Sequence, residues 1–227
     1  MALRTAPERA PARRSRHRRS FWRRRAAVVV VLLLAVVGSL VLTRSSGPHL
    51  SPRRERIVEL AESQLGVRTD PRTSYCNSYS AFWKSGSEAC PNGLRSEEWC
   101  ADFAAWVWHE AGVHFVYGLA EGDLNGTSAS FYEWGVAHHE WHPVGSRYVP
   151  EGGDVAVYGL DEGALSAQHV AVVTSFVAGS RGPNVVNGDG SRTAFSVVEA
   201  GTDQWKADIH DDGGKLSGYV SPPAGHT

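Results

Sequence analysis

The feature that most constrains this chain is an apolar run of 18 residues, 26–43, which has no charged side chain and lies between Arg25 and Arg44. As a helix it would span roughly 27 Å, enough to cross the hydrocarbon core of a bilayer. We therefore predict a single transmembrane helix over residues 26–43. The alternatives are a cleaved signal peptide, whose apolar core would be unusually long, and a twin-arginine export signal starting at Arg18-Arg19.

Charge is distributed unevenly on the two sides of this run. The whole chain has 23 basic and 24 acidic residues, a net charge of −1. Residues 1–25 hold ten Arg and one Glu, whereas residues 45–227 hold 12 basic and 23 acidic residues, a net charge of −11 (12 − 23). The positive-inside rule keeps the basic tail in the cytoplasm and puts the rest outside. Because the exported part is acidic, we expect no nucleic-acid partner.

This pattern divides the chain into five parts. We predict a basic cytoplasmic tail (1–25), a transmembrane helix (26–43), a linker (44–50), one folded domain (51–220) and a disordered C-terminus (221–227). With 42% hydrophobic and 10% aromatic residues, the chain has enough apolar side chains to form a core, so disorder throughout is excluded.

Within the domain, helical patterns come first and strand patterns follow. Ser51-Pro52 opens an amphipathic helix that we expect to end at Gly66, and a second helix is predicted over 97–111. Residues 67–95 are rich in Ser, Asn, Gly and Pro and are expected to form an irregular loop. The segments GGDVAVYGL, QHVAVVTSFV, NVVNGDG and FSVVEAG then predict short antiparallel strands. This order of elements favours an α+β domain.

The chain has three cysteines, an odd number that needs an explanation in an exported domain. Cys76 and Cys90 flank a polar loop, and a disulfide between them is geometrically easy. Cys100 would then be free, in the first turn of the second helix, where the helix N-terminus favours a thiolate. Two neighbouring glutamates oppose that effect, so activation requires a basic partner. The plain alternative is a buried core cysteine.

Polar residues at two strand ends provide such a partner. His169 begins one predicted strand and is the candidate base. Asn187 and Asp189 end the next strand, and either could accept the Nδ1 N–H of His169 and hold its tautomer. A nucleophile, a base and an orienting polar group are what thiol acyl transfer needs. The alternatives are an exposed strand-end histidine and a β-turn at Asn187-Gly188-Asp189-Gly190.

The sequence HHEWH also invites a metal interpretation. His138 and His142 have the i, i+4 spacing that suits two ligands on one helix face. No third ligand follows at a fixed offset, so we expect a solvated histidine cluster and no metal or cofactor.

Several of these segments together resemble a known family. The segments EEWCADFAAWVWHEAGV, GGDVAVYG, QHVAVVTSF and VVNGDG resemble the CHAP family of cysteine- and histidine-dependent amidohydrolases and peptidases, which is similar to NlpC-type and papain-like thiol hydrolases. The resemblance runs from about Ile57 to Ala200 and implies that Cys100 is the nucleophile and His169 the base. The third position usually carries Glu within Glu-Gly-Asn, where this chain has Asn187-Gly188-Asp189, so either residue remains a candidate.

The resemblance implies an α+β, papain-like CHAP fold in domain 51–220, with the Cys-bearing helix packed on a small antiparallel sheet. It also implies hydrolysis of amide bonds in peptidoglycan peptides through an acyl-enzyme. The altered third position keeps an alternative open, a weak or inactive CHAP-fold module that binds or scaffolds at the cell wall. We expect a monomer anchored through residues 26–43 with its domain outside the cell, or a secreted form if that segment is cleaved.

Overall fold

A computed structural model of the chain describes residues 50–180, 182–190, 198–201 and 215–224. The chain divides into two compact units, Met1–His49 and Leu50–Thr227, and the described residues belong to the second. The predicted tail and transmembrane helix therefore lie outside the described residues. Within those residues, no helix has the length and apolar character needed to span a bilayer.

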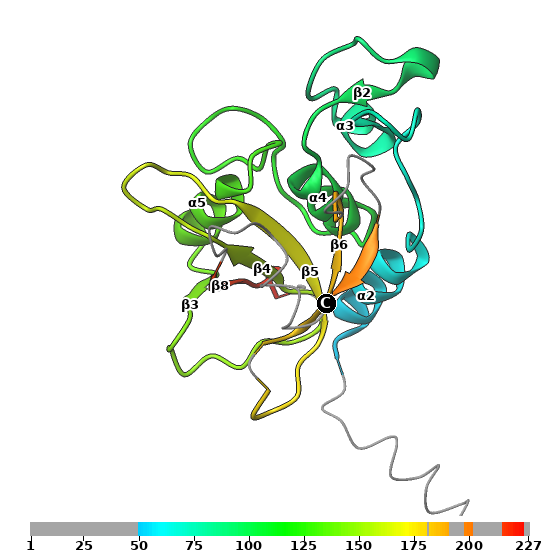
Figure 1. The fold of residues 1–227 in the computed structure, drawn as a ribbon. Coiled ribbons are helices and arrows are strands. Elements are labelled where there is room, and N and C mark those ends of the chain that lie inside the picture. The colour runs from blue at the N-terminus through cyan, green and yellow to red at the C-terminus, as the bar shows by residue number, and fades with distance from the viewer. Residues whose placement is uncertain (1–49, 181, 191–197, 202–214, 225–227) are drawn as a thin grey trace, which may run out of the picture. The chain divides into compact units, whose positions relative to one another are not determined.

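The described part of the second unit contains a six-stranded antiparallel sheet with the order β3-β8-β4-β5-β6-β7 (Figure 1). Its strands are β3 (Trp141–Pro143), β4 (Val155–Tyr158), β5 (His169–Ser175), β6 (Asn184–Asn187), β7 (Glu199–Gly201) and β8 (Leu216–Val220). A separate two-stranded ribbon pairs β1 (Cys76–Asn77) with β2 (Arg95–Ser96). The four segments predicted as strands correspond to β4, β5, β6 and β7.

Helices pack on one face of this sheet. They are α2 (Pro52–Ser63), α4 (Cys100–Glu110) and α5 (Ala129–Ala137), while α3 (Ser78–Trp83) packs on α4. In Figure 1, α4 lies beside β5 and β6, and α5 lies beside β4 and β8. The strands alternate accordingly, because Val170 and Val172 join the helical core whereas Ala171 and Val173 belong to a second buried cluster. The α+β class and the Cys-bearing helix on a small antiparallel sheet are thus confirmed.

Local sequence explains where the helices begin and end. Ser51 caps α2, since its Oγ accepts the Arg54 N–H at 3.4 Å and Pro52 occupies the first helical position. The chain leaves this helix through Gly66, whose φ of +88° suits glycine. Helix α4 begins at Cys100, three residues later than predicted, so Cys100 is its first residue.

Two segments differ from the sequence predictions. The stretch predicted as an irregular loop contains α3, the β1–β2 ribbon and a 3₁₀ turn (Pro91–Gly93). The structure describes residues 221–224, which belong to the segment predicted to be disordered. There Ser221 is buried and its Oγ donates to Glu140 Oε2 at 2.8 Å, while Arg53 Nη1 donates to the Pro223 carbonyl at 3.2 Å. Residues 225–227 lie outside the described part.

Candidate active site

Cys100 occupies the first position of α4 and is the only free cysteine of the three in the chain. Its side chain is buried, with 6% of the residue exposed. The Sγ atom lies 3.2 Å from the Ser128 Oγ. The backbones of Val170 and Ala101 also hydrogen bond to this thiol. Since Val170 directly follows His169, the thiol lies against the beginning of β5.

His169 and Asn187 form the second part of the site. His169 Nε2 lies 3.1 Å from Asn187 Oδ1, and both side chains are buried. The two residues are diagonal neighbours on adjacent strands, because β5 and β6 pair Val172 with Val186 and Val173 with Val185. Since an amide oxygen only accepts, His169 donates through Nε2. The contact with Asn187 thus uses Nε2 where Nδ1 was predicted, and in this tautomer Nδ1 is the basic ring nitrogen.

Asp189 takes a different place in the structure. Its Oδ2 accepts the Trp99 backbone N–H at 3.2 Å, which joins the end of β6 to the N-cap position of α4. Asp189 has a φ of +58°, so the chain turns sharply after the strand. Of the two candidates, Asn187 contacts the His169 ring, and Asp189 accepts a backbone N–H at the N-terminus of α4.

Gly188 explains how β6 approaches α4 so closely. A Cβ atom at this position would lie 2.4 Å from the Cβ of Phe103. Only glycine therefore allows this backbone to contact the helix one turn after Cys100. The dipeptide that resembles a turn in the sequence serves here as a close contact between strand and helix.

The electrostatics of Cys100 oppose a resting thiolate. Burial, the largest effect, and the nearby Asp189 charge raise the pKa of the Cys100 thiol, which is about 11 overall. Hydrogen bonds from Ser128 and from the Val170 and Ala101 backbones act in the opposite direction. At neutral pH the isolated thiol is therefore protonated and needs a base to become a nucleophile.

The other two cysteines stabilise the wall of the site. Cys76 and Cys90 form a disulfide with a Cα–Cα distance of 5.7 Å. Three residues after Cys76, the Tyr79 ring stacks on Trp99 with a centroid separation of 5.2 Å. Trp99 directly precedes the candidate nucleophile, so the ribbon and α3 pack against the start of α4.

The histidines of HHEWH bind separate partners. His138, at the C-cap of α5, has its Nδ1 2.8 Å from the Trp134 carbonyl. His142, on β3, has its Nε2 2.7 Å from Ser221 Oγ. Over the ranges that the structure describes, no group of three or more His, Cys, Asp or Glu side chains could hold a metal ion.

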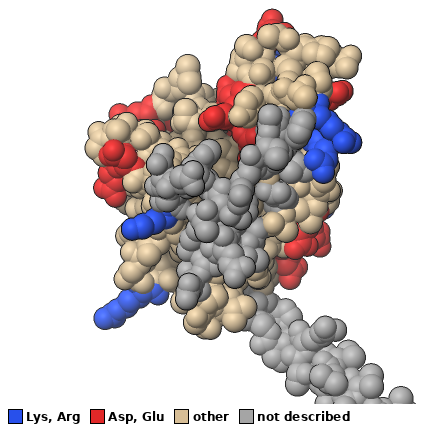
Figure 2. Space-filling view, in the orientation of Figure 1, with Lys and Arg blue, Asp and Glu red and all other residues tan. Residues whose placement is uncertain are grey.

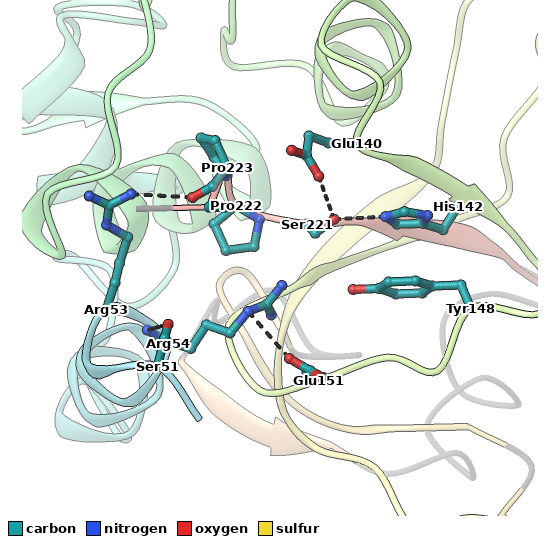
Figure 3. Close-up of a pocket in the computed structure, with 11 residues that line it drawn as sticks. Ser51, Arg53, Arg54, Glu140, His142, Tyr148, Glu151, Ser221, Pro222 and Pro223 are labelled. Atoms are coloured by element: carbon teal, nitrogen blue, oxygen red, sulfur yellow. Dashed lines mark hydrogen bonds and ion pairs between the residues drawn. The ribbon is translucent and has the colours of Figure 1, made fainter. Parts of the chain in front are cut away.

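A cavity of about 510 Å³ lies apart from this chemistry, and neither Cys100 nor His169 lines it. Figure 3 shows Ser221 between Glu140 and His142, with Arg54 reaching toward Glu151 on the opposite side. Several polar groups that line the cavity hydrogen bond or pair with one another, and these contacts hold the C-terminal segment in place.

The sequence predicted Cys100, His169, Asn187 and Asp189 as site residues but did not indicate Ser128. A serine before a helix normally predicts an N-cap, and nothing in the local sequence indicates that this hydroxyl contacts a thiol 28 residues away.

Fold and site together define a class of protein. A cysteine at a helix N-terminus lies against a strand that starts with His169, and the His169 ring contacts Asn187 at the end of the neighbouring strand. Cysteine, histidine and asparagine are the groups used by thiol hydrolases of the papain-like type. Residues 91–188 match the family model described as CHAP domain, so the predicted CHAP domain is confirmed over this segment. The match includes Cys100, His169 and Asn187 and ends one residue before Asp189. No curated protein and no solved structure gives a significant match.

The family match indicates the general class of reaction. A CHAP domain suggests a hydrolase of the peptidoglycan amidase or peptidase type, with a substrate derived from peptidoglycan.

Proposed function

We propose that this protein is a membrane-anchored, extracytoplasmic thiol hydrolase that cleaves amide bonds in peptidoglycan peptides. The observation that carries the proposal is the 3.1 Å contact between His169 Nε2 and Asn187 Oδ1, next to a thiol bonded by the Val170 backbone. That contact fixes the histidine tautomer and turns Nδ1 into the acceptor that a thiol nucleophile requires.

The mechanism is acyl transfer through a thioester. His169 Nδ1 takes the Cys100 proton as Sγ attacks the amide carbonyl carbon. The Cys100 backbone N–H, which has no intrahelical acceptor at the first position of α4, stabilises the oxyanion. The imidazolium then protonates the leaving amine as the C–N bond breaks. Water, deprotonated by His169, hydrolyses the thioester and restores the thiol.

The raised pKa of Cys100 makes a base necessary. A thiol with a pKa of about 11 is protonated at pH 7, so His169 has to take its proton for Sγ to attack. Asn187 suits this scheme, because a neutral amide orients the imidazole and stabilises an imidazolium less than a carboxylate would.

A second function has one observation in its favour. The same buried thiol of high pKa suits a CHAP-fold module that binds cell wall without cleaving it. Such a module has no need for a buried His–Asn pair, which favours the hydrolase. Binding to peptidoglycan without release of fragments would favour the module.

Membrane anchoring rests on the sequence of residues 1–44, where an uncharged apolar run follows ten arginines. The full chain should therefore sediment with bacterial membranes, and protease added outside spheroplasts should digest its C-terminal unit. Recovery of the intact unit in the soluble extracellular fraction would indicate a cleaved export signal instead.

The activity itself is tested with the full-length chain, purified in detergent and incubated with purified peptidoglycan. Mass spectrometry of the soluble products should reveal fragments that carry one new amine and one new carboxyl group at a single amide position. Products cut at a sugar–sugar bond, or peptidoglycan retained on the protein with no product, would contradict the proposal.

A further inference from the structure

Ser128 occupies the N-cap position of α5 but does not cap the helix. Serine at this position normally accepts a backbone N–H two or three residues ahead, and here its side chain makes no such bond. Its hydroxyl instead lies 3.2 Å from Cys100 Sγ, in a buried contact between two segments 28 residues apart. The Ser128 hydroxyl therefore contacts the thiol and does not cap α5.

The turn before α5 presents Ser128 in a fixed position. Asn125 Oδ1 accepts the Thr127 N–H at 2.9 Å, and Ser130 Oγ donates to the Thr127 carbonyl at 2.7 Å. The Asn125 N–H in turn donates to Ser130 Oγ at 3.1 Å. These bonds surround Ser128 in sequence and do not use its hydroxyl. The backbone on either side of Ser128 is thus held in place before any charge forms on the sulfur.

The surroundings of Cys100 disfavour a charged sulfur, and the Ser128 hydroxyl opposes that effect. Burial and the Asp189 carboxylate, which comes from the end of β6, both disfavour a thiolate. His169 at the start of β5 can take the proton but leaves an anionic sulfur in a buried site. Besides the two backbone donors from Val170 and Ala101, Ser128 supplies the side-chain hydrogen bond that favours the anion.

We propose that Ser128 is a further catalytic residue, whose hydroxyl donates to the Cys100 sulfur and stabilises the thiolate as His169 removes the proton. The hydroxyl proton stays on Ser128, and the thiol proton moves to His169. This role deepens the proposed hydrolase function, because it concerns the same nucleophile.

Alkylation of the full-length chain by iodoacetamide tests this role without any peptidoglycan. Cys76 and Cys90 are joined in a disulfide, so the label reports Cys100 alone. In the wild type the rate should climb steadily from pH 7 towards a midpoint near the thiol pKa of about 11. In Ser128→Ala the rate at pH 9 should fall about tenfold, as the midpoint moves upward by about one unit. Ser128→Thr, which keeps the hydroxyl, should return most of the rate.

The matched control is Ser85→Ala. Ser85 also donates to a residue of α4, since its Oγ lies 2.5 Å from Asp102 Oδ2, but the contact does not involve the thiol. This variant should leave the alkylation profile unchanged. An unshifted profile in a folded Ser128→Ala or Ser128→Gly variant would overturn the proposal, and so would unfolding of both. Because no wall substrate is present, failure of peptidoglycan hydrolysis remains a separate result.

Discussion

At the scale of single residues, the site is a balance around one sulfur atom. Hydrogen bonds from Ser128 and from two backbone groups favour proton loss from Cys100, while burial and Asp189 oppose it. Asp189 has two opposite effects. Its carboxylate accepts the Trp99 N–H and so joins β6 to α4, but its charge raises the pKa of the Cys100 thiol.

This conflict predicts the effect of Asp189→Asn. An asparagine oxygen can still accept the Trp99 N–H, but the negative charge that raises the Cys100 pKa is removed. The pKa of the thiol should therefore fall, and alkylation at pH 8 should accelerate about threefold to tenfold. Glu59→Gln, which removes an exposed charge on α2, is the control and should change nothing. A slower or unchanged reaction in a folded Asp189→Asn protein would contradict this assignment.

Residue types alone predicted Cys100 and His169, because a free cysteine near a helix start and a histidine at a strand start are visible in the sequence. The choice between Asn187 and Asp189 could not be predicted from the sequence, because it depends on the register of β5 against β6. The use of Nε2 and the contact of Ser128 with the thiol depend on side-chain direction in three dimensions, and sequence spacing does not specify it.

At the scale of elements, the strands with long apolar runs were the easiest to predict. β4, β5 and β6 are buried on both faces, so their Val-rich segments are evident. β3 was missed because it is only three residues long and ends in proline, and β8 because Gly218 and Ser217 interrupt its apolar pattern. The pairing of these two strands creates one edge of the sheet, which local sequence does not reveal.

Helix α2 is fastened to the start of β4 by a buried ion pair. Arg54 Nη1 lies 2.6 Å from Asp154 Oδ1, with 14% of the arginine side chain and 0% of the aspartate side chain exposed. Arg54→Met should leave Asp154 buried without its counter-ion and lower the free energy of unfolding by about 3–5 kcal/mol, measured by urea denaturation.

The control for this prediction lies two residues further along α2. Arg56 forms an exposed pair with Glu59, with side chains 56% and 70% exposed, so Arg56→Met should cost less than about 1 kcal/mol. Equal losses for Arg54→Met and Arg56→Met would show that the buried pair contributes no more than a surface pair.

At the scale of the whole molecule, the near-zero net charge conceals two opposite parts. The −1 total combines ten arginines in residues 1–25 with an excess of acidic residues after position 44. Figure 2 shows acidic side chains in several groups over one face of the described domain. An acidic domain gains little electrostatic attraction to an anionic cell wall, so we propose that the anchor, and not wall affinity, sets its location.

The proposed hydrolysis of peptidoglycan requires Cys100 as the nucleophile, and one comparison tests this role most directly. The rate of soluble fragment release from purified peptidoglycan is measured for the full-length wild type and for Cys100→Ala, after matching thermal melts show that both are folded. We predict that release by the variant falls roughly 10³-fold or more, to the level without protein. Release by Cys100→Ala at the wild-type rate would contradict this role.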